Sequence, residues 1–467
     1  MRVALVNPPW SFDRSIYFGC REPHLPLEYG YTKALLERDG HDVLVADAQL
    51  GFVWRTDDEA SPFSGDDAGL HQALEHFLPD ATVITTAPSY LFWRCAPPEL
   101  RVPMRTLDAI RRVAGRTIAV GPHASSTPGA ALRKLKVDLA VLGECEGVLR
   151  QLASMDPSRW HDVGSVAWLD GGHGDQLIRN GQPASADLKT LPVLRWPSHA
   201  LRRHRHHHHR FERAPDGPGA ELEASRGCPY HCTFCAKENF RDVFRKRPLA
   251  VLRDEIDALI AEGVTYAYFI DEIFVPDRPL LEMLAERDIA FGVQMRIDNW
   301  TPELLELLGR AGCVSIEAGL ESITERGRSL LAKKCKLTTE ELTELLIHAK
   351  KFVPFVQANL LEATTDDPKK VTAWRERLGR HGVWANEPVP LFPYPGSPEY
   401  TLRFGACDDD AWERAHEHYL AQFKTFSDIQ ESAPAALAEL EGARALTGIE
   451  DTPGEFRGSK GRGSHVQ

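Results

Sequence analysis

The sequence predicts an α/β protein with two successive parallel sheets, a Rossmann-like open sheet and then a partial (β/α)6 barrel, followed by a small helical C-terminal region. Two observations lead to this expectation. Short apolar runs alternate with amphipathic stretches over residues 1–170, and the alternation resumes over residues 221–400. Residues 171–220 between them are rich in turn-forming residues, which favours a connector between two domains.

The composition bounds the class of protein. With 467 residues and 43% hydrophobic residues, the chain is long enough for two or three cores. No apolar run approaches the roughly 20 residues of a membrane span, and we see no signal peptide, so a cytoplasmic protein without a membrane partner is expected. A net charge of -12 disfavours nucleic acid as a partner. A monomer is the default expectation.

The first region contains five predicted strands, at residues 2–7, 42–47, 81–86, 117–121 and 138–143. Their buried, β-branched character indicates a parallel sheet covered by helices on both faces. Such sheets bind ligands at the C-terminal ends of their strands. No GxGxxG motif follows the first strand, which disfavours a dinucleotide. The candidate ligand contacts at these ends are Asn7, Pro8, Thr86, Ser89, Tyr90, Gly121, His123, Gly143 and Glu144.

The connector contains a basic, histidine-dense run, LRRHRHHHHRFER, at residues 201–213. A linker or surface loop is the preferred interpretation, because compositional tracts rarely have fixed ligand geometry. A zinc or phosphate site is the less favoured alternative.

The second region contains six predicted strands, at residues 221–227, 265–271, 290–298, 313–319, 353–359 and 382–389, with helical patterns between them. Active sites of barrels lie at the C-terminal ends of the strands. The polar residues expected there are Asp271, Glu272, Arg296, Asp298, Glu317, Glu321, Gln357 and Asn359. Residues 401–453 are expected to form a few helices, and residues 454–467 a disordered tail.

Three cysteines, Cys228, Cys232 and Cys235, fall within the eight residues that follow the first strand of this barrel. Four thiolates would close every iron of a ferredoxin-type cluster, whereas three would leave one iron open to a ligand. The alternative is a zinc knuckle built from the cysteines and His231. The position of the loop on a barrel favours the cluster.

The spacing of these cysteines, with Phe234 before the last one, resembles the CxxxCxΦC signature of the radical S-adenosylmethionine (SAM) superfamily. The resemblance implies a 4Fe-4S cluster on the three cysteines and SAM on the open iron. It also implies a reductase, or a flavodoxin or ferredoxin, as electron donor. Phe234 and the polar barrel residues are the implied SAM contacts: Asp271, Glu272, Arg296, Glu317, Glu321, Gln357 and Asn359.

The first region is similar to the cobalamin-binding domain that one subfamily of these enzymes places before the barrel. The motifs behind this likeness are NPP, GPH and GECEG at its strand ends, together with PLFPYPGSPEY at residues 390–400. Cys145 replaces the second glycine of the usual GEGE motif. The implied domains are thus a cobalamin-binding domain (1–170), a connector (171–220), a radical SAM barrel (221–400), a helical region (401–453) and a tail (454–467).

The Asp-x-His-x-x-Gly motif, through which many cobalamin proteins supply a lower axial histidine, is absent. The loop at residues 86–95 is therefore expected to cover the lower face of the corrin, through Ser89, Tyr90, Trp93 or Arg94. A domain that has lost cobalamin is the alternative.

The resemblance implies methylation of an unactivated carbon of a small metabolite, through a 5′-deoxyadenosyl radical and methylcobalamin. Two alternatives stay open: a cobalamin-dependent radical cyclisation or rearrangement without net methyl transfer, and a zinc-stabilised binding module. The sequence does not identify the substrate.

Overall fold

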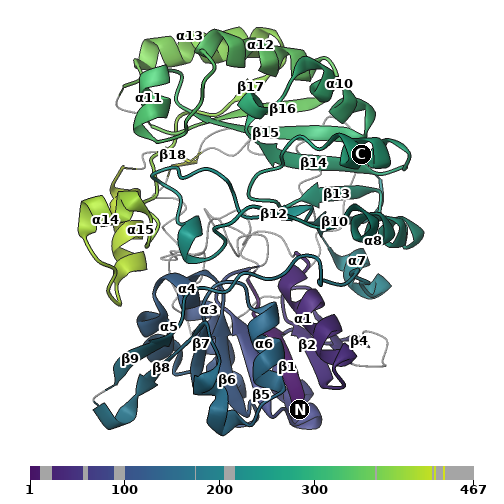
Figure 1. Cartoon of the computed structure of the whole chain (residues 1–467), viewed down its shortest axis with the longest axis vertical. Coiled ribbons are helices and arrows are strands. Elements are labelled where there is room, and N and C mark those ends of the chain that lie inside the picture. The colour runs from purple at the N-terminus through teal and green to yellow at the C-terminus, as the bar shows by residue number, and fades with distance from the viewer. Residues whose placement is uncertain are drawn as a thin grey trace.

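The computed structural model describes residues 1–10, 24–55, 61–88, 100–173, 175–204, 216–362, 365–422, 425–426 and 435–436. A mixed sheet and a parallel sheet, each with its helices, form the two halves of the molecule, one above the other in Figure 1. The α/β fold class and the order of the two sheets are as predicted.

The first sheet has nine strands in the order β4-β3-β2-β1-β5-β6-β7-β8-β9. The five predicted strands form its parallel centre: β1 (Arg2–Asn7), β2 (Asp42–Asp47), β5 (Ala81–Thr85), β6 (Arg116–Val120) and β7 (Leu139–Val141). Antiparallel strands extend both edges: β3 (Phe52–Arg55), β4 (Ser61–Pro62), β8 (Val166–Asp170) and β9 (Gln176–Asn180). These edge strands were not predicted from the sequence, because they are short or half-exposed.

The helices of this half are α1 (Leu27–Arg38), α2 (Asp67–Phe77), α3 (Arg101–Ile110), α4 (Pro122–Ser126), α5 (Pro128–Leu135) and α6 (Glu146–Ala153). The central strands are almost wholly buried because helices cover the sheet. Tyr29 of α1 joins helix to sheet, as its hydroxyl donates to the carbonyl of Val6 at 3.0 Å.

The second sheet is entirely parallel, in the order β10-β13-β14-β15-β16-β17. Its strands are β10 (Gly219–Leu222), β13 (Tyr266–Phe269), β14 (Ala290–Met295), β15 (Cys313–Glu321), β16 (Phe355–Leu360) and β17 (Trp384–Ala385). Its helices are α8 (Leu249–Ala261), α9 (Arg278–Ala285), α10 (Pro302–Arg310), α11 (Glu325–Leu330), α12 (Thr339–Lys350) and α13 (Pro368–Arg380). Strands in sequence order with intervening helices make the predicted partial barrel.

The segment expected to be a connector contains regular structure. Its residues 176–180 form β9, which completes the first sheet, and α7 (Ser198–Arg203) lies near the barrel end of the segment. None of the residues of β9 is fully buried, which is typical of an edge strand.

The C-terminal region contains α14 (Pro398–Phe404) and α15 (Ala411–Gln422), which lie together at one side of the molecule (Figure 1). A two-residue bridge joins β18 (Thr425–Phe426) to β19 (Ala435–Ala436). The rest of the expected helical region and tail is outside the described residues. Among the described residues, none of the helices combines the length and apolar character needed to cross a bilayer.

Candidate active site

The cysteine loop is held at its base by a small hairpin. The strands β11 (Ser225–Arg226) and β12 (Arg245–Lys246) pair antiparallel directly after β10. Gly227 begins the loop with φ 78°, and a Cβ there would lie 2.2 Å from the carbonyl oxygen of Val243. Only glycine fits so close an approach in this conformation. The hairpin therefore fixes the cysteines above the C-terminal end of the first barrel strand.

The three thiols on this loop, those of Cys228, Cys232 and Cys235, are partly buried and not in disulfides. Burial raises the pKa of each thiol, and that of Cys235 reaches about 12. A thiolate is stable in such surroundings only beside a compensating cation, such as the iron of a cluster. Phe234 is partly exposed next to Cys235. The donor set and its burial thus fit a metal cluster.

The acidic pair after β13 binds the segment that leads into the cysteine loop. Glu272 lies at the start of this loop, because its carboxylate accepts from the Gly227 N–H at 2.8 Å. Asp271 lies slightly before it, where it accepts from the Ala224 N–H at 2.9 Å and from the Ser225 hydroxyl. Asp271 also lines a cavity of about 240 Å3 between the hairpin and α9. Burial raises the pKa of Asp271 to about 7. Only Glu272 is therefore next to the cysteines.

Arg296 and Asp298, at the end of β14, form a pair with Nη2 and Oδ2 2.7 Å apart. The Arg296 guanidinium also lies 3.7 Å above the ring of Tyr230, a residue of the cysteine loop. Its Nη1 atom is buried without a hydrogen-bond partner among the described residues. A buried cationic donor that has no partner in the described part of the chain suits an anionic ligand group such as a carboxylate.

The end of β15 is strained at a predicted contact. Glu321 has φ 66°, a conformation uncommon outside glycine, and its carboxylate binds Lys333 Nζ at 2.6 Å. The absence of a side chain at Gly319 leaves room for this carboxylate, since a Cβ there would lie 2.8 Å from Glu321 Oε1. Non-glycine residues in this region cluster at functional sites. Lys333 had no sequence signal, because it lies in an irregular segment after α11.

The remaining predicted barrel contacts lie on neighbouring strands. Glu317 Oε1 is 3.4 Å from the Tyr268 hydroxyl, and the side-chain amide of Gln357 donates to Asn359 Oδ1. The Oε1 atom of Gln357 is buried without a partner in the described part of the chain. Because β15 and β16 are paired with Glu317 opposite Gln357, these side chains form one polar row.

The predicted contacts of the first sheet lie at its C-terminal edge. Asn7 donates to Asp47 Oδ2 at 3.0 Å, and the Thr86 hydroxyl donates to the Val120 carbonyl at 2.8 Å. Gly121 has φ 104°, and a Cβ at Gly143 would lie 2.4 Å from the Ala184 carbonyl oxygen. Pro8 follows Asn7 directly. Ser89, Tyr90, Trp93 and Arg94 lie outside the described residues, so the expected lower-face loop stays a prediction.

Glu144, an expected ligand contact of the first sheet, takes part in ion pairs that the sequence did not predict. Its buried carboxylate pairs with Arg226 at 3.1 Å and with Arg245, both from the cysteine hairpin. Arg226 also lies 2.8 Å from both Glu146 and Glu223. The arginines hold the pKa of Glu144 below its ordinary value despite burial. The GECEG motif thus anchors the cysteine loop, a role that sequence patterns between distant segments do not show.

His123 stacks on Trp412 of α15, with ring centroids 4.1 Å apart. The Trp412 indole N–H donates to the Thr127 hydroxyl at 3.0 Å. Beside it, Lys134 Nζ lies 2.6 Å from Glu413. The C-terminal helix therefore closes one side of the edge at which the first sheet was expected to bind its ligand.

Residues 222–371 match the family model described as the radical SAM superfamily. Cytidylyl-2-hydroxyethylphosphonate methyltransferase of Streptomyces wedmorensis is 26% identical over 405 residues, which are 75% of this chain and 70% of that protein. An uncharacterised methyltransferase of Pyrococcus horikoshii is 23% identical over 366 residues, 75% of this chain and 72% of that protein.

Two solved structures share the fold. One is the radical S-adenosylmethionine methyltransferase TsrM from Kitasatospora setae with cobalamin and a 4Fe-4S cluster bound, with a TM-score of 0.65 at 18% identity over 85% of this chain and 73% of that chain. The other is the cobalamin-dependent S-adenosylmethionine radical enzyme OxsB with aqua-cobalamin bound, with a TM-score of 0.63 at 16% identity over 93% and 64%. These matches span both sheets and confirm the predicted fold class.

Proposed function

We propose, from the radical SAM domain at residues 222–371 and the fold shared with cobalamin-dependent radical SAM enzymes, that this protein methylates an unactivated carbon of a small molecule. The proposed cofactors are a 4Fe-4S cluster, SAM and cobalamin. One observation carries the proposal: a buried ion-pair network joins the base of the cysteine loop to the ligand-binding edge of the first sheet. This network holds the cysteine loop against the first sheet, and in the proposal the cofactors of the two halves meet near this contact.

In this proposal Cys228, Cys232 and Cys235 hold the cluster, which supplies the electron that cleaves SAM into methionine and a 5′-deoxyadenosyl radical. The chain's own residues bind and orient. Glu272 would accept from the SAM ammonium group, which its position beside Gly227 supports, and the unpartnered Nη1 of Arg296 would bind a carboxylate. A reductase, or a flavodoxin or ferredoxin, is the proposed electron source.

The first sheet is the proposed cobalamin site, because parallel α/β sheets bind ligands at the C-terminal ends of their strands, where Gly121 adopts a φ of 104° that favours glycine. The buried Oδ1 atom of Asn7 has no partner among the described residues and offers an acceptor at the same edge. His123 and Thr86, which follow neighbouring strands, are further proposed contacts. Glu144 is proposed to hold the cysteine loop in place through its ion pair with Arg226.

The test begins with anaerobically reconstituted protein, SAM and a reductant. We expect about four irons per chain and formation of 5′-deoxyadenosine, with both reduced at least tenfold by Cys228→Ala, Cys232→Ala or Cys235→Ala. Cys407→Ser, a change at an exposed cysteine, is the matched control and retains both. Colourless protein with stoichiometric zinc and no iron would instead support the zinc-stabilised binding module.

Methyl-labelled SAM and candidate small substrates test the net reaction. Label in the product supports carbon methylation. A rearranged product with all label left in methionine or SAM supports the second candidate, a radical cyclisation or rearrangement. That candidate is favoured by a 24% identity over 355 residues, 69% of this chain and 54% of that protein, to the anaerobic magnesium-protoporphyrin IX monomethyl ester cyclase of Cereibacter sphaeroides.

A further inference from the structure

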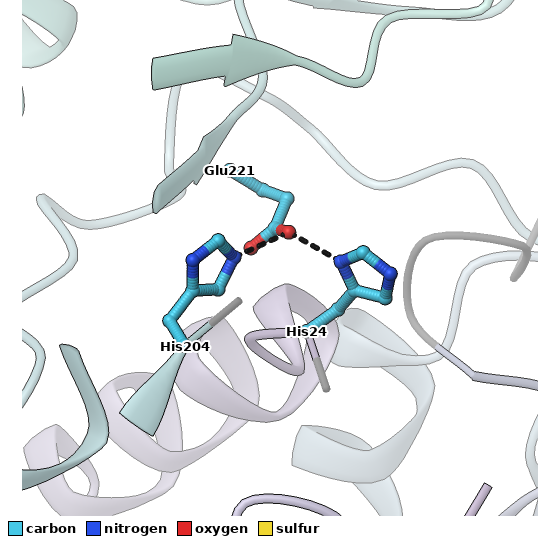
Figure 2. A group of neighbouring side chains, drawn as sticks. All are labelled: His24, His204 and Glu221. Carbon is cyan, nitrogen blue, oxygen red and sulfur yellow. Dashed lines mark hydrogen bonds and ion pairs between the residues drawn. The ribbon is translucent and has the colours of Figure 1, made fainter. Parts of the chain in front are cut away.

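A second cluster of metal-ligating side chains lies away from the cysteine loop. His24, His204 and Glu221 converge from three distant chain segments, as Figure 2 shows. His24 precedes α1 of the first half, His204 ends α7, and Glu221 is on β10, the first barrel strand. The seam between the two halves of the molecule thus carries two imidazoles and one carboxylate at a single point.

The three side chains are buried to an unusual degree for ionisable groups. Both imidazoles are 0% exposed, and the Glu221 side chain is 1% exposed. His24 Nδ1 and His204 Nε2 each lie 2.7 Å from the same atom, Glu221 Oε1. The candidate ligand atoms all lie within 4.8 Å of one another. They therefore already face a common centre.

We propose that His24, His204 and Glu221 bind one zinc ion, or a similar divalent transition metal, that fastens the first half of the molecule to the first barrel strand. Two imidazole nitrogens and a carboxylate are a donor set that zinc prefers over magnesium or calcium, which take oxygen ligands. This proposal is independent of the radical SAM function.

The surroundings support metal binding in two further ways. The Leu25 N–H donates to Glu221 Oε2 at 3.2 Å, so the second carboxylate oxygen is held while Oε1 faces the histidines. Such outer hydrogen bonds orient metal-ligating carboxylates. The charge also agrees, because the wholly buried Glu221 carboxylate is an anionic group that a divalent cation would stabilise.

Small side-chain shifts bring the three ligand atoms to three corners of a tetrahedron around the metal. Zinc holds nitrogen and oxygen ligands at about 2.0–2.2 Å, which puts neighbouring ligand atoms about 3.3 Å apart. Each 2.7 Å nitrogen–oxygen separation therefore widens by about half an ångström on binding. A backbone hydrogen bond holds His204 in position, because its N–H donates to the Ala200 carbonyl at the end of α7. The proposed site is thus largely pre-formed.

The first test measures metals in the full-length holoenzyme. The protein is produced with added zinc, purified without a metal-affinity column, and washed with EDTA. Because His206 to His209 offer further imidazoles, the variant in which these four are replaced by serine is the background. We expect about one zinc per chain in addition to about four irons. Full iron occupancy excludes zinc at the cysteines. Less than a tenth of one zinc overturns the proposal.

Variants in the same background locate the metal. Glu221→Gln and His24→Asn are expected to lower the retained zinc at least tenfold, while His381→Gln, a change at an exposed histidine, leaves it unchanged. Zinc that is retained in Glu221→Gln overturns the site. If these variants fail to fold, cobalt(II) replaces zinc in the unaltered triad. Intense visible bands of four-coordinate cobalt beyond the cluster absorption then support the proposal, and their absence overturns it.

Discussion

Arg226 of the second half and Glu144 of the first form a wholly buried ion pair, with Nη1 and Oε2 3.1 Å apart. Arg226 precedes the first cysteine by two residues. Its second terminal nitrogen lies 2.8 Å from both Glu146 and Glu223. A single guanidinium therefore compensates carboxylates of both halves, and its five donors suit this task better than the ammonium of lysine.

Arg226→Ala is expected to destabilise the fold by about 3–5 kcal/mol, because it leaves buried carboxylates without their cation. Urea unfolding of the cluster-free protein at neutral pH measures the change. The matched control is Arg150→Ala, which breaks the more exposed pair with Asp39 and should change the free energy of unfolding far less. Equal effects of the two variants would contradict a special role for the buried pair.

Gly319→Ala is expected to weaken SAM binding while the fold is retained. The new Cβ would lie 2.8 Å from Glu321 Oε1, so the carboxylate must leave its position beside Lys333. SAM titration of the reconstituted protein should show a rise in Kd of about tenfold, which corresponds to about 1.4 kcal/mol. Gly379→Ala is the control, since a Cβ there meets no atom within 4 Å. An unchanged Kd would separate Glu321 from the SAM site.

Asp271 should make stability depend on pH. Burial raises the pKa of Asp271 to about 7, above its value in the unfolded chain. The contribution of this group to the free energy of unfolding is therefore fully present below pH about 4 and is lost as the pH rises through 7. Between pH 5.5 and 8 this single group should reduce the free energy of unfolding by about 2 kcal/mol relative to Asp271→Asn. Urea titrations of both proteins at several pH values give the difference. Parallel pH profiles would contradict the raised pKa.

Trp412 should determine how firmly α15 docks on the first half. Trp412→Ala removes the stack on His123 and the bond to Thr127, at a cost of about 3–5 kcal/mol. Hydrogen exchange of the α15 amides should then accelerate by about 100-fold or more, while α10 is unaffected.

Trp412→Phe is the graded comparison for this helix. It keeps an aromatic ring against His123 but loses the indole N–H, so it should cost only about 1 kcal/mol. If hydrogen exchange of the α15 amides is equally fast in the wild type and in Trp412→Ala, then α15 docks through its ion pairs, such as that of Lys134 with Glu413.

Sequence reasoning succeeded where the signal is local. The strands at residues 2–7 and 42–47 have the predicted bounds, because a buried parallel strand is a continuous apolar run. The edge strands β8 and β9 and the two-residue β17 were missed or overextended, because pairing with a neighbour, rather than their own composition, makes them strands. The order of the strands predicts which polar residues lie at the C-terminal ends of the barrel strands. The roles of these residues in binding SAM stay predictions.

By itself the sequence determined the two α/β halves and the three-cysteine loop, because apolar periodicity and ligand spacing act over a few residues. Only the tertiary structure decided the partners of Arg226, Trp412 and His24. These side chains meet groups 82, 285 and 197 positions away along the chain. Such contacts depend on how the two sheets pack together, and no short-range pattern encodes that packing.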